Sequence, residues 1–157
     1  MDKMNIGIET KERELVVDAL SRTLADTYTL YLETHRYHWN VTGKMFQTLH
    51  DMFEQQYTDM WNAIDELAER IRSLGAFAPG TYQQFSKLTS IEVNDDVPPA
   101  LTMVSNILKG HETLIRTARK GLEEAEKAHD QATADLLTQR VQIHEKTAWM
   151  LRSLLQD

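Results

Sequence analysis

The sequence predicts an all-α protein folded as a four-helix bundle. Long stretches carry apolar residues at spacings of three and four, which is the period of an amphipathic helix. Only 6 glycines and 3 prolines occur in 157 residues, too few turn residues for a many-stranded β fold. These breaks gather at Gly43, in residues 75–80 and in residues 94–99, with a weaker one near residues 127–130. Four long segments therefore remain.

The first two helices are expected on either side of the Gly43 turn. The first should run from about Thr10, acting as its N-cap, to about Trp39. The second should run from about Met45 to about Leu74. A helix rises about 1.5 Å per residue, so each of these segments is long enough to span a bundle.

The third helix should begin after Pro98 and Pro99, because proline suits the first helical position. Its predicted core stripe is Leu101, Val104, Leu108, His111, Ile115, Ala118, Leu122 and Ala125. The fourth should begin near Asp130, a second candidate N-cap. The segment between the second and third helices can cross the bundle, with a short extra helix around residues 82–85. Residues 1–157 thus form one predicted domain, with residues 1–9 as a short tail.

Composition excludes several functional classes. There are no cysteines, which excludes a disulfide scaffold, a thiolate metal site, an iron–sulfur cluster and a cysteine nucleophile. No apolar run reaches the length of a membrane span, and no signal-peptide pattern is visible, so we expect a cytoplasmic protein. The formal charge of −7 disfavours binding of nucleic acid over the whole surface and favours cationic partners such as metal ions.

Two pairs of potential metal ligands lie on the second predicted helix. His50 and Glu54 are four residues apart and share a face, as do Asp65 and Glu69. Both pairs lie on one stripe, because the eleven residues from Glu54 to Asp65 bring the helix almost back to the same face. Eleven residues also rise about 16 Å, too far for one metal ion to be held by both pairs.

A symmetric dimer removes this conflict. If the helix packs antiparallel against a two-fold copy centred between residues 59 and 60, His50 faces Glu69 of the copy. Glu54 then faces Asp65 of the copy, and the dimer gains two such sites. Imidazoles and carboxylates suit iron, manganese or zinc, and open positions favour redox work on iron. Structural ion pairs or a solvated face remain the alternative for these residues.

Other residues surround the predicted site. His38 ends the first helix, and the turn at Gly43 can return it beside the second helix as another imidazole. His35 shares its face, as an accessory ligand, a hydrogen-bond partner or a rim histidine. Trp39 and Trp61 either pack in an interface or intercept stray oxidising equivalents. His111 interrupts an apolar stripe and is expected to be buried with its hydrogen bonds satisfied.

Several segments resemble the signature of the Dps family, the DNA-binding proteins from starved cells, also called miniferritins. They span nearly the whole chain and are 38-HWNVTG-43, Phe46, Leu49-His50, Phe53-Glu54, 65-DELAERI-71, 136-LLTQR-140 and 144-HEKTAWML-151. The resemblance implies a ferritin-like bundle, a short helix in the long connection and a hollow shell of twelve subunits.

The resemblance also implies an activity. Family members oxidise Fe(II), preferably with hydrogen peroxide rather than O2, and store the ferric mineral, which protects the cell from oxidative stress. Carried onto this sequence, each ferroxidase site takes His38, His50 and Glu54 from one subunit and Asp65 and Glu69 from its neighbour. Some members have aspartate where this chain has Glu54.

Acidic residues cluster at the junction of the third and fourth helices, where the family has three-fold pores. They are Glu123, Glu124, Glu126, Asp130 and Asp135. Asp130 and Asp135 are the first candidates for drawing in Fe(II), and a solvated face is the alternative.

DNA binding is expected to be weak or absent, because phosphate affinity needs clustered basic residues. Residues 1–14 mix both signs of charge, and no basic run follows Leu155. The basic residues there are Lys3, Lys11 and Arg13, against the acidic Asp2, Glu9, Glu12 and Glu14. Two alternative functions therefore stay open: a nucleoid protein that compacts DNA, and a structural bundle without metal chemistry.

Overall fold

The computed structural model describes residue 1 and residues 3–156; Asp2 and Asp157 lie outside the described residues. The described chain forms five helices and no strand. They are α1 (Thr10–Asn40), α2 (Phe46–Ser73), α3 (Tyr82–Leu88), α4 (Ala100–Lys127) and α5 (Gln131–Ser153). The predicted all-α bundle, with a short extra helix in the long connection, is confirmed.

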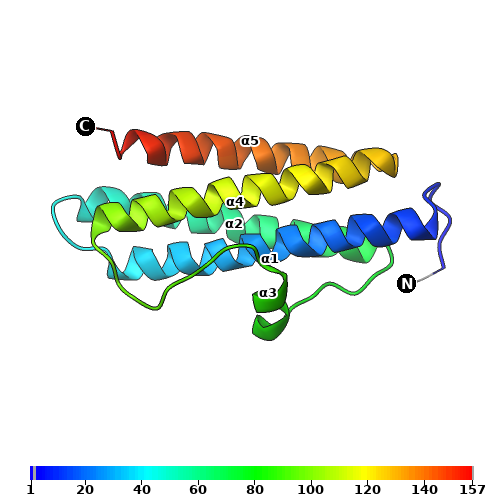
Figure 1. Cartoon of the computed structure of the whole chain (residues 1–157), viewed down its shortest axis with the longest axis horizontal. Coiled ribbons are helices and arrows are strands. Elements are labelled where there is room, and N and C mark those ends of the chain that lie inside the picture. The colour runs from blue at the N-terminus through cyan, green and yellow to red at the C-terminus, as the bar shows by residue number, and fades with distance from the viewer. Residues whose placement is uncertain (2, 157) are drawn as a thin grey trace.

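The four long helices lie along the long axis of the molecule, and the short α3 sits against the side of α1 (Figure 1). Helices α2 and α4 run in the same direction, so the connection between them, residues 74–99, travels back along the bundle (Figure 1). Within the described residues, no helix is both long enough and apolar enough to cross a membrane.

One of the two predicted N-caps is confirmed. The Asp130 carboxylate accepts a hydrogen bond from the backbone N–H of Thr133 and so caps α5. The N-cap of α1 was predicted wrongly: it is Glu9, without a side-chain cap, and Thr10 is the first helical residue. The Thr10 hydroxyl instead accepts a hydrogen bond from the guanidinium of Arg13.

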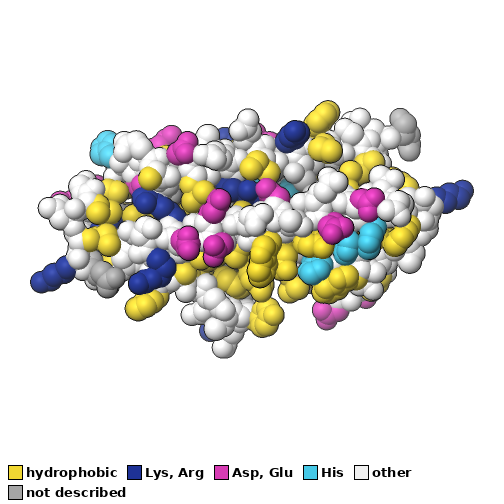
Figure 2. Space-filling model, turned by 180° about the vertical axis from the view of Figure 1, so that it is seen from behind, with side chains coloured by type: hydrophobic (Ala, Val, Ile, Leu, Met, Phe, Trp, Pro, Cys, Tyr) yellow, Lys and Arg dark blue, Asp and Glu magenta, His cyan; other side chains and the backbone are white. Residues whose placement is uncertain are grey.

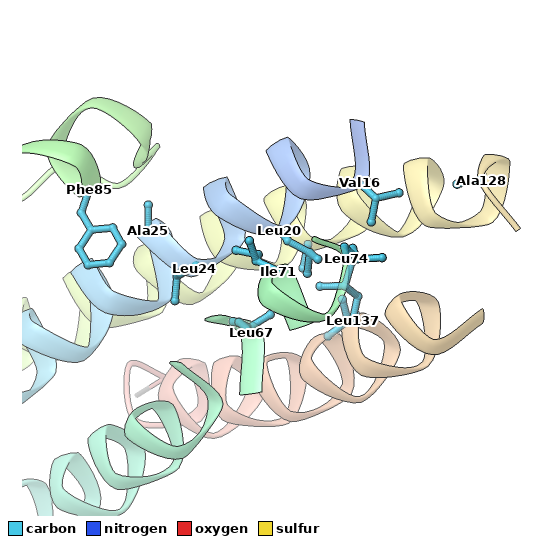
Figure 3. Close-up of a cluster of buried hydrophobic side chains, with 12 residues drawn as sticks. Val16, Leu20, Leu24, Ala25, Leu67, Ile71, Leu74, Phe85, Ala128 and Leu137 are labelled. Atoms are coloured by element: carbon cyan, nitrogen blue, oxygen red, sulfur yellow. The ribbon is translucent and has the colours of Figure 1, made fainter. Parts of the chain in front are cut away.

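The bundle interior divides into two apolar clusters, one towards each end. The first joins α1, α2 and α5 through Leu20, Leu24, Leu67, Ile71 and Leu137, with Phe85 of α3 covering one side (Figure 3). The second takes residues from the α1–α2 turn and the start of α4, among them Leu30, Tyr37, Leu49, Phe53, Met60, Met103 and Ile107.

Helix α4 buries a broader face than a single apolar stripe. Leu101, on the predicted stripe, is 50% exposed, whereas Ile107 and Gly110, which are off the stripe, are buried. A Cβ atom added to Gly110 would lie 2.5 Å from Cδ1 of Leu30, so α1 and α4 approach closely at this glycine. The face is broad because α4 packs against both α1 and α5.

A buried carboxylate fixes the long connection to the bundle. Asp26 on α1 has no exposed surface. It accepts hydrogen bonds from the Thr89 hydroxyl at 2.7 Å, the Ser90 backbone N–H at 2.6 Å and the Thr117 hydroxyl at 2.6 Å. One side chain therefore ties the connection to both α1 and α4.

Replacing Asp26 with alanine should strongly destabilise the fold. Three hydrogen-bond donors would lose a buried charged acceptor, and we expect the free energy of unfolding to fall by about 3 kcal/mol. Chemical denaturation measures this change. The matched control is Asp18→Ala, which removes an exposed ion pair with Arg22 on the same helix and should cost at most about 0.5 kcal/mol. Equal losses for the two variants would contradict the assigned role of Asp26.

Candidate metal centre

The turn between α1 and α2 brings two histidines face to face. Gly43, with a φ of +100°, takes the left-handed conformation that this tight turn requires. Nδ1 of His38 lies 2.8 Å from the backbone oxygen of His50, and Nδ1 of His50 lies 2.8 Å from the backbone oxygen of His38. The two rings stack with centroids 3.8 Å apart.

These reciprocal hydrogen bonds fix the tautomer of both rings. A carbonyl oxygen can only accept, so each Nδ1 must carry a proton and donate it. In the neutral ring, Nε2 of His38 and of His50 then keeps its lone pair. A metal-ligating histidine is commonly arranged in this way, with one ring nitrogen donating to a carbonyl and the other facing the metal.

A carboxylate lies one helical turn beyond the histidine pair. Glu54 is exposed on α2, four residues after His50. Partial burial, and then the negative charge of Glu54, raises the pKa of the neighbouring Tyr57. Figure 2 shows histidine side chains gathered near the end of the molecule that holds the α1–α2 turn, with acidic side chains beside them.

The second acidic pair lies further along α2. Asp65 and Glu69 are both exposed, and Asp65 lines an open surface hollow together with Trp61. Among the described residues, no group of three or more His, Cys, Asp or Glu side chains is close enough to hold a metal ion. A single chain thus brings His38 and His50 together, but none of the predicted acidic ligands lies close enough to form a metal site with both histidines.

Aromatic side chains surround the histidine pair. His35 stacks on Tyr57 at 4.1 Å and lies 4.1 Å from the Trp39 ring, which places it at the rim of the site. Burial, and then the charge of His38, lowers the pKa of His35. Trp61 lies 5.6 Å from Tyr31, in the same band of rings.

Both predicted tryptophans are more than half exposed on the single chain. Tyr57 was not predicted as a residue of the site, although it lies only three residues after Glu54 on the same helix.

The two pore candidates differ in their surroundings. Asp130 is only 3% exposed, and its carboxylate pairs with Arg70 at 2.7 Å and accepts hydrogen bonds from Thr133. Burial alone would raise the pKa of Asp130, but the hydrogen bonds from Thr133 and Arg70 outweigh it and the pKa is lowered. Asp130 is thus already engaged within the subunit, whereas Asp135 is exposed and bonded only to Gln139 among the contacts found.

A second histidine pair lies in the interior, between α4 and α5. His111 is buried, as predicted, and its Nδ1 lies 2.9 Å from Nδ1 of His144. The expectation that all its hydrogen bonds are satisfied was wrong, because Nε2 of His111 is buried and has no partner within the described part of the chain. Nε2 of His144 lies 3.2 Å from the guanidinium of Arg140, which also pairs with Asp59 at 2.6 Å.

This interior pair resists protonation. Burial, and then the charge of Arg140, lowers the pKa of His111 to about 3. Burial, followed by the charges of His111 and Arg140, lowers the pKa of His144 well below its ordinary value. This pair was not predicted, although both residues carry a local signal: His111 interrupts the apolar stripe of α4, and His144 lies between Val141 and Ala148 on the buried face of α5.

Comparison with known proteins places the chain in a family. Residues 17–157 match the family model of the ferritin-like domain. The chain is 37% identical to DNA protection during starvation protein 2 of Bacillus anthracis, over 89% of this chain and 96% of that one. It is 35% identical to the DNA protection during starvation protein of Brevibacillus brevis, over 95% of this chain and all of that one. The chain belongs to the Dps family.

The structure of this Dps chain agrees with its sequence relationships. It superposes on the Dps protein of Vibrio cholerae O1 with a TM-score of 0.94 and 33% identity, covering 99% of this chain and 98% of that one. That protein is described as a member of the ferritin-like diiron-carboxylate superfamily. Membership of the Dps family, with its ferritin-like domain, supports an iron-storage role for this chain.

The interior histidines make the stability of this Dps chain depend on pH. His111 stays neutral in the folded chain down to about pH 3, whereas in the unfolded chain it binds a proton below about pH 6.5. The stability that neutral His111 contributes to the fold is therefore fully present above about pH 6.5 and is lost progressively as the pH falls below that value. Between pH 7 and pH 5 we expect the free energy of unfolding to drop by about 1–2 kcal/mol from this group alone.

Denaturation at several pH values measures this slope. The variant His111→Phe should flatten it. The control His129→Asn changes an exposed histidine and should leave the slope as in the wild type. An unchanged slope in His111→Phe would show that this histidine does not set the pH dependence.

Proposed function

We propose that this chain is the subunit of an iron-storing and iron-detoxifying Dps shell that oxidises Fe(II), preferably with hydrogen peroxide. The observation that carries the proposal is the His38–His50 pair, whose two Nε2 lone pairs are made available by reciprocal backbone hydrogen bonds. The proposed site is completed by acids from a second copy, in a cytoplasmic homo-oligomer that is most simply a dodecamer of two-fold dimers.

The need for a second copy follows from where the acids lie. Asp65 and Glu69 are exposed on the same helix as His50 and lie about 22 Å and about 28 Å further along it. An antiparallel α2–α2 contact about a two-fold axis would bring the acids of one copy to the histidines of the other, and would do so twice. Glu54, the remaining acid of the proposed ligand set, is exposed on the same side as His50.

The chemistry suits this mixed ligand set. His38 and His50 would bind Fe(II) through neutral Nε2, and the carboxylates would stabilise the harder Fe(III) product. Two ferrous ions give up one electron each, the O–O bond of peroxide breaks, and two protons complete two water molecules. No hydroxyl radical is released in that balance. Zinc or manganese would compete for the same ligands, and O2 would serve as a slower oxidant.

The exposed tryptophans have two proposed roles beside this site. Trp39 and Trp61 would be covered by the neighbouring copy in the dimer, which accounts for large apolar rings on the surface of the single chain. Their closeness to His35 and Tyr31 would also let them intercept oxidising equivalents that escape the site.

The alternative function is protection of DNA mainly by compaction. Relatives of this chain carry the name DNA protection during starvation protein. The formal charge of −7 opposes phosphate binding. Of the basic residues near the start of the chain, Arg13 is buried and donates to the backbone oxygen of Leu74. We therefore place iron chemistry first.

Removing the acidic pair should abolish rapid oxidation of iron. The double variant Asp65→Ala/Glu69→Ala and the double variant His38→Ala/His50→Ala should each lose at least about tenfold in the initial rate, because each lacks half of every site. The rate is followed by ferric absorbance after Fe(II) and peroxide are added. An unchanged rate in the acidic variant would reject the site assignment.

Mixed assemblies test whether the site is shared. When the two double variants are refolded together, a dimer containing one chain of each type has one intact site and one site without any ligand pair. Random pairing should restore about a quarter of the wild-type activity. A site built within one chain would recover nothing on mixing, so that result would contradict the shared geometry.

The pore proposal now rests on Asp135. The variant Asp135→Asn should slow iron uptake several-fold at low salt, because an acidic ring focuses Fe(II) towards the pore. The difference should shrink as salt screens the charge. Oxidation of iron on shells opened into dimers should stay at the wild-type rate. Equal losses in both assays would count against a pore role.

Weak DNA binding is expected at neutral pH and physiological salt. A gel-shift titration of linear duplex DNA should show no complex below micromolar protein concentrations, because few basic side chains are available to replace condensed counterions. A sub-micromolar complex that resists physiological salt would favour the compaction function instead.

A further inference from the structure

A cavity of about 210 Å³ opens between α2 and α5. Its lining residues are Met52, Gln55, Gln56, Asp59, His111, Ile143, Thr147 and Met150. The cavity can exist because α2 and α5 touch each other at few points, which leaves His111 of α4 at its base. It belongs to the other side of α2 from the proposed metal ligands, none of which lines it.

Two buried polar atoms at this cavity have no hydrogen-bond partner among residues 1 and 3–156. They are Nε2 of His111 and Oε1 of Gln56. A buried polar atom left unpaired destabilises the fold, and native proteins usually satisfy such atoms with a ligand or an ordered water. Both atoms belong to residues that line the same cavity, so a small ligand there could pair with both of them.

The neighbouring hydrogen bonds decide which kind of ligand fits. Arg140 can only donate, so Nε2 of His144 must accept. Neutral His144 then carries its proton on Nδ1 and donates it to Nδ1 of His111. Neutral His111 must therefore carry its own proton on Nε2, the atom that has no partner.

This tautomer makes the site reject cations. A metal ion needs the Nε2 lone pair of His111, which would push the proton back to Nδ1 and reverse the bond to His144. The reversed His144 would point an N–H group at the guanidinium of Arg140, which is held by Asp59. The ligand must instead accept from His111 and donate to Gln56.

We propose that this cavity binds one small neutral hydroxylic molecule, water or hydrogen peroxide, between the Nε2–H of His111 and Oε1 of Gln56. Both molecules donate and accept hydrogen bonds, and both fit the volume. The site is separate from the proposed ferroxidase site and does not depend on iron being oxidised there.

Two methionines in the lining allow bound peroxide to be told apart from bound water, because only peroxide can oxidise them. The thioether sulfur of Met52 or Met150 can attack one peroxide oxygen, and the O–O bond then breaks. The departing oxygen accepts a hydrogen bond from the Nε2–H of His111 and takes the proton of the hydroxyl group left on sulfur, so it leaves as water. The sum is one thioether and one peroxide giving one sulfoxide and one water.

Crystals of the assembled, iron-free protein test occupancy. We expect an oxygen atom within about 2.7–3.2 Å of both Nε2 of His111 and Oε1 of Gln56. It should be lost in Gln56→Leu, which keeps the size of the side chain and removes the acceptor. Gln47→Leu, on the same helix and outside the cavity, is the matched control. Absence of this oxygen in the wild type would overturn the proposal.

Zinc-soaked crystals test the exclusion of cations. No anomalous peak should lie at Nε2 of His111. A zinc ion on this nitrogen would overturn the tautomer argument and with it the proposal.

Peptide mass spectrometry of iron-free protein treated with hydrogen peroxide separates the two ligands. If peroxide enters, Met52 should form sulfoxide faster than the exposed Met1, and Gln56→Leu and His111→Phe should each lower that ratio at least threefold. If the oxygen is present and the ratio follows exposure in every variant, the resident molecule is water and the site stands. If Gln47→Leu lowers the ratio as much as Gln56→Leu does, peroxide binding in this cavity is rejected.

Discussion

Two reciprocal hydrogen bonds across a short turn hold the candidate metal centre together. His38 and His50 each donate from Nδ1 to the backbone oxygen of the other, so the end of α1 and the beginning of α2 are fixed in register. The same bonds stack the rings and leave both Nε2 atoms as acceptors. The turn at Gly43 must be short for these bonds to form. Ligand geometry and helix packing thus depend on one local constraint.

The two histidine pairs show how a neighbour decides what an imidazole can bind. Backbone oxygens accept from His38 and His50, which exposes a lone pair on the opposite nitrogen. In the interior pair, Arg140 donates to Nε2 of His144, and His144 donates from Nδ1 to Nδ1 of His111. Neutral His111 therefore carries its proton on Nε2. The first pair suits a metal ion and the second suits a hydrogen-bond acceptor. The presence of a histidine alone therefore does not predict whether the ring binds a metal ion or donates a hydrogen bond.

Local signals in the sequence predicted the helices well, and contacts between distant residues limited the rest. The predicted ends of the long helices agree within one or two residues, because periodicity and turn residues are local properties, whereas the short helix extends three residues beyond the predicted residues 82–85. Thr10 failed as a cap because its hydroxyl serves Arg13 instead. Burial of Asp130 depends on Arg70, about sixty residues away, and the exposure of Leu101 depends on how α4 lies between two neighbours. The shared acidic ligands were inferred from their spacing along α2 and from the family resemblance, and they stay a prediction.

Parallel α2 and α4 oblige the chain to return along the bundle, and a segment of that length has much conformational freedom to lose. Asp26 holds residues 89 and 90 near the middle of residues 74–99. The crossing therefore behaves as two short spans, each closed separately, rather than as one long loop. Loop-closure entropy grows only slowly with length, so the benefit of this anchor lies chiefly in fixing the path of the chain over α1. The carboxylate of Asp26 therefore fixes the path of the connection between α2 and α4. That path in turn determines the shape of the outer surface over α1.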